Sequence, residues 1–209
     1  MFIYCGNQPV TRYDSTGKIW LELGIGYLTY EALKDGLQLY NSKHNSELDS
    51  NSETTTAGKL ITNQNESPAK DFKYGFYNAS WNGCEAIAVH NAKLLMGKSS
   101  SLSETIDHFY DANAIIGAGG FGSFPSRIGQ VLESYGIKYK CVGIDEMTQS
   151  GIYIISYWNA SHPFKGLHTI AITYYNEEYR SYNSRYDNDN NYTPAIHGER
   201  FICGYFLEG

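Results

Sequence analysis

Apolar residues near the start of the chain follow two different patterns. A short apolar run at residues 18–23 predicts a strand, and residues 30–43 predict a helix because their apolar side chains recur at intervals of four and three. Residues 44–70 are rich in Asn, Ser, Thr, Glu and Lys, and they bury too little apolar surface to offset their ordering entropy. We therefore expect residues 1–70 to form an N-terminal extension that ends in a polar linker or mobile loop.

Helical periodicity dominates the first half of the region that follows. One apolar stripe begins at Cys84, and a capping box at Ser101 precedes a second helix. Pro125 suits the first turn of a third helix. The glycine-rich residues 117–122 predict a loop, which lacks the Lys-Ser/Thr of a phosphate-binding P-loop. The predicted helices span residues 84–97, 101–111 and 125–136.

The periodicity then changes to that of β-strands. Five short runs of β-branched and aromatic residues are separated by turn-forming residues. Helices followed by an antiparallel sheet predict an α+β fold for residues 71–209. The predicted strands span residues 137–142, 152–157, 167–175, 179–183 and 201–207.

Composition and charge argue against several classes of function. The formal net charge is −6 and no Lys/Arg cluster is present, so nucleic acid is not an expected partner. The four cysteines form no Cys-x-x-Cys pair, and we expect neither a metal nor a cofactor. No run of about 18 apolar residues predicts a membrane span. Residues 1–6 lack the features of a signal peptide, so we expect a cytoplasmic protein or a secreted one whose signal has been removed.

Cys84 is the first candidate for chemistry. It directly follows Gly83 in the first turn of a predicted helix, where free backbone N–H groups and the positive end of the helix dipole favour a thiolate. Its own N–H can help to hold an oxyanion, and the side chain of Asn78 can supply a second donor. The alternatives are that Cys84 is a small buried core residue and that Asn78 is an ordinary loop asparagine.

His168 begins a predicted strand, at the end where a side chain can reach a cleft. If the next turn falls among residues 175–178, Asn183 lies opposite a residue between His168 and Ala171. Its amide could then orient the imidazole ring. The alternative for His168 is a core histidine, and Asp187 is the rival orienting residue.

The order of these residues along the chain carries a resemblance. Residues 82–85 (Asn-Gly-Cys-Glu), followed by an amphipathic helix, resemble the start of papain-fold peptidases of the C39-like, bacteriocin-processing type. The run at residues 151–157, then a loop and residues 168–172, resembles their second half. Residues 182–184 (Tyr-Asn-Ser) are similar to the Asn-Ser step that carries the third catalytic residue of papain-like enzymes. The resemblance covers about residues 76–184.

This resemblance implies a papain-like fold and a cysteine peptidase that acts on a peptide or protein substrate without a cofactor. Cys84 would be the nucleophile, His168 the base and Asn183 its orienting partner, and Asn78 stands where the family usually has Gln. Acyl transfer to an amine or deamidation would use the same residues. The alternative function is a C39-like module that binds peptides with weak or no catalysis. Residues 1–70 could act as a pro-segment lying across the cleft.

Overall fold

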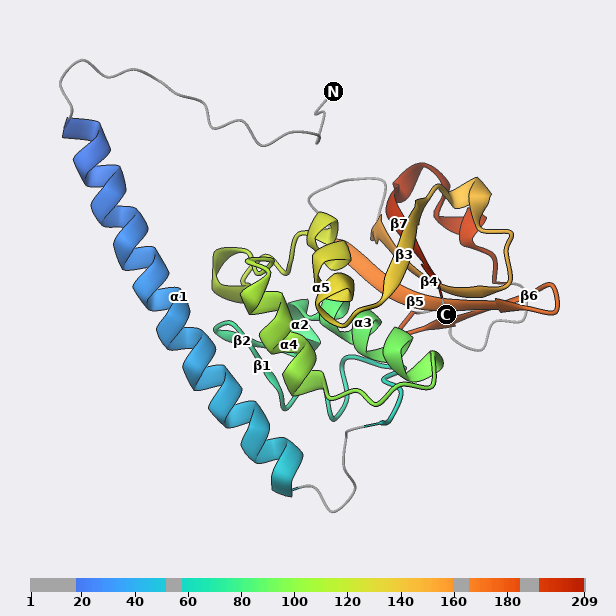
Figure 1. Cartoon of the computed structure of the whole chain (residues 1–209), viewed down its shortest axis with the longest axis horizontal. Coiled ribbons are helices and arrows are strands. Elements are labelled where there is room, and N and C mark those ends of the chain that lie inside the picture. The colour runs from blue at the N-terminus through green and yellow to red at the C-terminus, as the bar shows by residue number, and fades with distance from the viewer. Residues whose placement is uncertain (1–17, 52–57, 160–165, 185–191, 209) are drawn as a thin grey trace. The chain divides into compact units, whose positions relative to one another are not determined.

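The computed structural model describes residues 18–51, 58–159, 166–184 and 192–208. The chain divides into two compact units, Met1–Gly36 and Leu37–Gly209. The described part of the first unit is helical and belongs to α1 (Lys18–Asn51), a helix whose second half lies in the second unit (Figure 1).

Helix α1 corrects one expectation for the N-terminal region and confirms another. Residues 18–23, predicted as a strand, are helical, so that prediction is wrong. Residues 30–43, predicted as a helix, lie within α1. A run of six residues with four apolar side chains is too short for periodicity to separate a strand from one face of a helix, and here the helix continues beyond it to Asn51.

Parts of the expected polar linker belong to the second unit. Residues 44–51 complete α1, and Ile61 is buried in the core. Asn45 is also buried, and its side chain bonds the backbone of Lys73 twice: Nδ2 donates to the carbonyl oxygen at 2.9 Å, and Oδ1 accepts from the N–H at 2.7 Å. Polar residues of this kind order a segment through hydrogen bonds, which a count of apolar residues does not detect. Residues 52–57 of the expected linker lie outside the described residues.

The helices of the second unit precede its sheet. After α1 they are α2 (Ala79–Asn82), α3 (Cys84–Leu95), α4 (Leu102–Asp111) and α5 (Ile128–Ser134). A small hairpin comes before them, made of β1 (Lys73–Tyr74) and β2 (Tyr77–Asn78). The strands of the sheet are β3 (Lys138–Val142), β4 (Gly151–Trp158), β5 (Leu167–Tyr175), β6 (Glu178–Tyr182) and β7 (Phe201–Glu208). Short 3-10 turns lie at Gly117–Gly119, Pro125–Arg127, Ile144–Glu146 and Pro194–Arg200.

The five strands form one antiparallel sheet in the order β3-β7-β4-β5-β6 (Figure 1). Helices at the start and an antiparallel sheet at the end confirm the predicted α+β class. The five strand predictions agree with the observed bounds to within two residues. None of the helices in the described ranges is long and apolar enough to cross a membrane.

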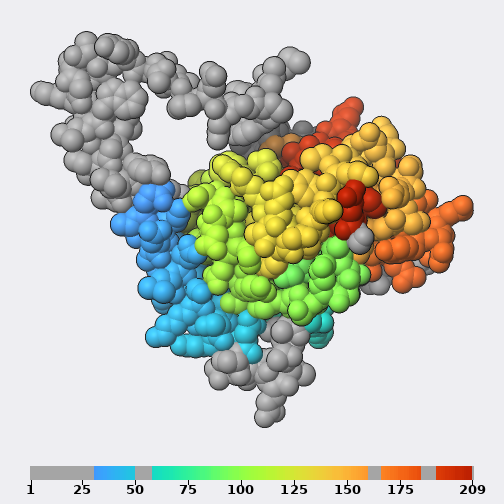
Figure 2. Space-filling model, viewed as in Figure 1, coloured from blue at the N-terminus to red at the C-terminus, as the bar shows by residue number. Residues whose placement is uncertain are grey.

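The two faces of the sheet bury different apolar clusters. Ile154 and Ala171 pack with the helices, whereas the alternate residues Ile155 and Ile170 point to a second cluster that contains Tyr192. Helix α3 lies directly on β4 and β5, and α4 and α5 pack against α3. Figure 2 shows α4 and α5 at the surface of the second unit. This layering places the first turn of α3, which begins with Cys84, against the start of β5, the strand that carries His168.

Candidate active site

Cys84 is the first residue of α3, as the sequence predicts. The preceding Gly83 is the N-cap and closes the short helix α2 by donating its N–H to the carbonyl oxygen of Ala79 at 2.8 Å. A Cβ atom at Gly83 would lie 2.8 Å from that same oxygen and 2.8 Å from the Cα of Ala79. Glycine therefore allows α2 and α3 to approach closely enough for the thiol to sit at a tight junction of the two helices.

The thiol of Cys84 contacts the backbone on both sides of His168. Its Sγ atom lies 3.9 Å from the carbonyl oxygen of Leu167, and the backbone N–H of Thr169 also bonds the sulfur. The side chain is 5% exposed. Burial raises the pKa of the thiol well above its ordinary value, the neighbouring Glu85 carboxyl raises it further, and the Thr169 N–H opposes the shift. In the resting arrangement the sulfur is therefore a neutral thiol.

His168 lies at the start of β5, on the face of the sheet opposite the helices. Its Nε2 atom is 2.6 Å from the backbone carbonyl oxygen of Asn183. Because a carbonyl oxygen can only accept, Nε2 must carry the hydrogen, which leaves the lone pair on Nδ1. Burial lowers the pKa of the imidazole, and the bond to Asn183 opposes that shift. His168 is therefore a neutral imidazole at pH 7, with Nδ1 able to accept a proton.

The hairpin that brings Asn183 to His168 has the register that the sequence predicts. Strands β5 and β6 are joined by a two-residue turn at Asn176 and Glu177, whose φ angles are 52° and 64°. Ala171 pairs with Tyr182, so Asn183 follows at the edge of β5. The chain order therefore located Asn183 correctly.

Asn183 bonds His168 through its backbone and not through its amide. The amide instead pairs with Gln64: Oδ1 accepts from the Gln64 N–H at 2.9 Å, and Nδ2 donates to Gln64 Oε1 at 2.9 Å. Asn183 has a φ of 66°, a left-handed conformation, and its carbonyl oxygen faces Nε2 of the imidazole. The side-chain amide of Asn183 was expected to contact the His168 ring, but the backbone carbonyl oxygen of Asn183 makes that contact instead. The amide holds Asn183 in place through its two hydrogen bonds to Gln64.

Gln64 is a site residue that sequence reasoning missed. Besides its pairing with Asn183, its Nε2 donates to the carbonyl oxygen of Ser80 at 3.1 Å. From the segment before β1, Gln64 therefore links α2 to the end of β6. The only sequence signal was a glutamine in the polar stretch that composition assigned to a linker, and no local pattern distinguishes it from its neighbours.

Asn78 and Asp187 are not brought to the thiol by the described structure. The Asn78 amide donates to the carbonyl oxygen of Lys70 at 2.5 Å, and its Oδ1 accepts from the ammonium of Lys73 at 3.0 Å. These bonds hold its side chain at the β1–β2 hairpin. Asp187, the rival orienting residue, lies outside the described residues.

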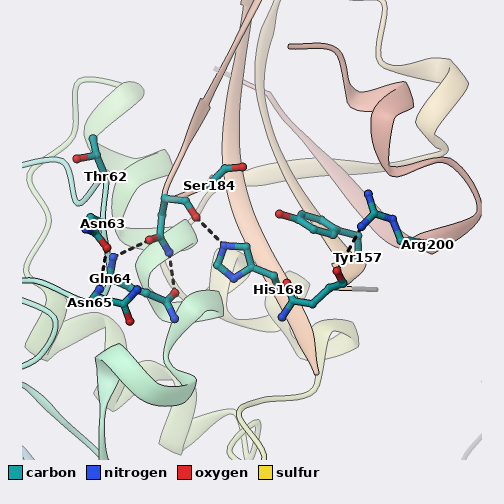
Figure 3. A pocket seen from close by; sticks show the side chains of 10 residues that line it. Thr62, Asn63, Gln64, Asn65, Tyr157, His168, Ser184 and Arg200 are labelled. Atoms are coloured by element: carbon teal, nitrogen blue, oxygen red, sulfur yellow. Dashed lines mark hydrogen bonds between the residues drawn. The ribbon is translucent and has the colours of Figure 1, made fainter. Parts of the chain in front are cut away.

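A cavity of about 430 Å³ opens beside His168 (Figure 3). The side chains that line it belong to polar residues and to Tyr157, which packs edge-on against the His168 ring with the ring centroids 5.8 Å apart. Cys84 does not line this cavity. The lining residues are Thr62, Asn63, Gln64, Asn65, Tyr157, Asn159, His168, Asn183, Ser184 and Arg200.

Glu85 is the second residue that sequence reasoning did not place in the site. Its side chain is 2% exposed, and Oε2 lies 3.4 Å from the Cys84 sulfur, within the range of an S–H hydrogen bond. In contrast, no hydrogen bond joins the Cys84 thiol to the His168 ring in the described part of the chain. The Cys84 thiol is thus hydrogen-bonded to the Glu85 carboxyl group and to the backbone next to His168, and not to the imidazole ring.

Comparison with known proteins adds no family to this geometry: no protein-family model matches the chain, and no curated protein matches its sequence. Among the described residues, no group of three or more His, Cys, Asp or Glu side chains could hold a metal ion.

Proposed function

We propose that the chain is a thiol hydrolase of papain-like, C39-like type, acting as a cysteine peptidase on a peptide or protein substrate. In this proposal Cys84 is the nucleophile and His168 is the base. Asn183 orients His168 through its backbone carbonyl. The resemblance of the sequence to C39-like peptidases and the meeting of these three residues support the same conclusion.

One observation carries the proposal most strongly. The sulfur of Cys84 contacts the carbonyl oxygen of Leu167 and the N–H of Thr169, the two residues that flank His168. At the same point the bond from Nε2 to Asn183 leaves Nδ1 of a neutral imidazole free to accept a proton. A nucleophile beside a base that a third residue orients is the arrangement that acyl transfer needs.

The reaction would require the Cys84 thiol to leave Glu85 and Nδ1 of His168 to come within hydrogen-bond distance of it. As sulfur attacks the scissile carbonyl, its proton passes to Nδ1 and the carbonyl oxygen takes up negative charge. Backbone N–H groups at the start of α3 lie where they can stabilise this oxyanion. The imidazolium then protonates the leaving amine, and water hydrolyses the thioester that remains on Cys84. Asn78 has no part in this sequence, because its side chain bonds Lys70 and Lys73.

The test is cleavage of a complex peptide library, read by mass spectrometry. The intact protein should generate new peptide ends, and Cys84→Ala should abolish them. His168→Ala should slow cleavage by about 100-fold or more, in the range measured for loss of a general base. His44→Ala is the matched control and should cleave normally. Absence of cleavage by the intact protein, or equal cleavage by Cys84→Ala, would contradict the proposal.

A second candidate function is peptide binding without cleavage. It is favoured by the resting thiol, which bonds Glu85 and makes no hydrogen bond to His168, and by a cavity that the thiol does not line. Under this function the intact protein and Cys84→Ala would bind the same peptides with equal affinity in calorimetry, and neither would cut them.

A further inference from the structure

Glu85 is a buried carboxyl group for which peptide cleavage by Cys84 and His168 has no use. It lies in the first turn of α3, and a Cβ atom at Gly122 would come 3.8 Å from both of its oxygens. The backbone N–H of Ser123 donates to the carboxyl group, and Ser123 is bonded in turn to the hydroxyl of Tyr74. These contacts enclose the carboxyl group between α3, β1 and the loop after residue 117.

No basic side chain balances the charge of this carboxyl group. Among the described residues, Glu85 makes no ion pair with Lys, Arg or His. The titratable groups that face it are the Cys84 thiol on α3, the Tyr74 hydroxyl on β1 and, farther away, the Cys203 thiol on β7. All three are acids that are neutral when protonated, so an ionised Glu85 would be a single uncompensated buried charge.

The contact between Glu85 and Cys84 affects how readily the Cys84 thiol ionises. Because the carboxylate oxygen lies 3.4 Å from sulfur, a thiolate at Cys84 would face a negative charge in a medium of low dielectric constant. A protonated carboxyl group would instead donate a hydrogen bond to the thiolate. The same side chain therefore opposes or supports ionisation of the thiol, depending on whether it carries a proton.

We propose that Glu85 is a positioning residue that holds Cys84 in its protonated, resting form, and that the nucleophile becomes reactive when the Glu85 carboxyl group takes up a proton. This inference rests on the proposed role of Cys84 as a nucleophile and adds a control that the Cys–His–Asn arrangement lacks. Burial raises the pKa of Glu85 to about 7, while hydrogen bonds from its own N–H, the Cys84 thiol and the Ser123 N–H oppose the shift. The proton is therefore exchanged near neutral pH.

The experiment measures alkylation of Cys84 by iodoacetamide between pH 6 and 10, by peptide mass spectrometry, in the full chain and in Glu85→Gln. The amide has the shape of the carboxyl group, carries no charge and can donate to a thiolate. Cys84 of Glu85→Gln should react at least about tenfold faster at pH 8, corresponding to a thiol pKa lower by about one unit. The exposed Cys141 reports on the reagent within the same sample, and Glu199→Gln, on the surface, should react as the unmodified chain does.

Equal or slower labelling of Cys84 in Glu85→Gln would overturn the proposal. A titration of Glu side-chain carboxyl groups by ¹³C NMR tests it without that variant, should the variant not fold. One carboxyl resonance should titrate near pH 7 and shift in Cys84→Ala, whereas midpoints that all lie near the ordinary value of about 4.3 would overturn the proposal.

The two proposals fail differently. If the intact chain cleaves peptides but Glu85→Gln labels no faster, only the role of Glu85 is wrong. If Glu85→Gln labels faster but no peptide is cleaved, Glu85 controls the thiol as proposed and the hydrolase function is wrong.

Discussion

At the scale of single residues, the chemistry depends on which atoms face the imidazole. The sequence placed Cys84 at the start of a helix and His168 at the start of a strand, and it predicted Asn183 one residue beyond the observed end of β6. It could not show that the Asn183 carbonyl, and not its amide, bonds the ring. That choice depends on the left-handed backbone of Asn183 and on the pairing of its amide with Gln64, a contact 119 residues away along the chain.

Substituting Asn183 with glycine separates the two ways of orienting His168. Glycine adopts a φ of 66° freely and keeps the carbonyl, while removing the amide. We expect kcat/KM to fall by no more than about 30-fold, the loss that follows from two neutral hydrogen bonds of about 1 kcal/mol each. Gln64→Ala removes the other half of the amide pair and should show a similar decrease. A loss of 1,000-fold in Asn183→Gly alone would mean that the amide is the catalytic partner.

The buried Glu85 should also make stability depend on pH. Its pKa is about 7 in the folded chain and near 4.5 when unfolded, so the folded state favours the protonated form. The sign follows from linkage: the native state loses stability as pH rises from about 4.5 through 7, by roughly 3 kcal/mol in total. Glu85→Gln should lack this decrease, in urea unfolding at pH 5 and pH 8. Parallel pH dependences for the two proteins would show that Glu85 ionises normally.

At the scale of elements, periodicity identified most helices and strands because each buries one face. It failed at residues 18–23, where a short apolar run belongs to the long helix α1. Composition, in turn, did not reveal that residues 44–51 are helical and that the buried Asn45 bonds the backbone of β1. For short apolar runs and for buried amides, the local sequence pattern carries too little information, and tertiary contacts determine the secondary structure and the order of the segment.

The junction of α2 and α3 should tolerate no side chain at Gly83. A Cβ atom there would lie 2.8 Å from backbone atoms of Ala79, which cannot move as a flexible side chain would. We expect Gly83→Ala to lower the free energy of unfolding by about 1–3 kcal/mol and to displace the start of α3, with loss of activity. Gly36→Ala, inside α1, meets nothing within 4 Å and should be neutral or stabilising. Chemical denaturation of both variants gives the comparison.

At the scale of the whole molecule, the α+β class followed from helices that precede a run of strands. The N-terminal boundary of the second unit did not follow from the sequence pattern, because the second half of α1 belongs to that unit. In that half of the helix, the Asn41 amide donates to the carbonyl oxygen of Gly75 at 2.9 Å and to the hydroxyl of Tyr110 at 2.7 Å. Composition alone cannot reveal such contacts.

Truncation tests this assignment. A chain that begins at Leu37 keeps all the buried residues of both apolar clusters and should unfold cooperatively. A chain that begins at Glu47 lacks Asn41 and Asn45 and should be less stable by several kcal/mol, because their four hydrogen bonds are lost and buried partners are left unpaired. Equal stability of the two chains in urea unfolding would place the boundary after residue 46.

An increase in activity on removing residues 1–36 would support a pro-segment role for that part of the expected extension.

The most direct test of the central claim is covalent capture of Cys84 by a library of peptidyl vinyl sulfones, with the labelled cysteine located by mass spectrometry. Cys141 is exposed and Cys84 is buried, so simple thiol reactivity would favour Cys141. We predict that the peptidyl probe labels Cys84 in the intact chain and not in His168→Ala, while Cys141 reacts equally in both. Labelling of Cys141 alone, or labelling of Cys84 that persists in His168→Ala, would contradict a Cys84–His168 hydrolase.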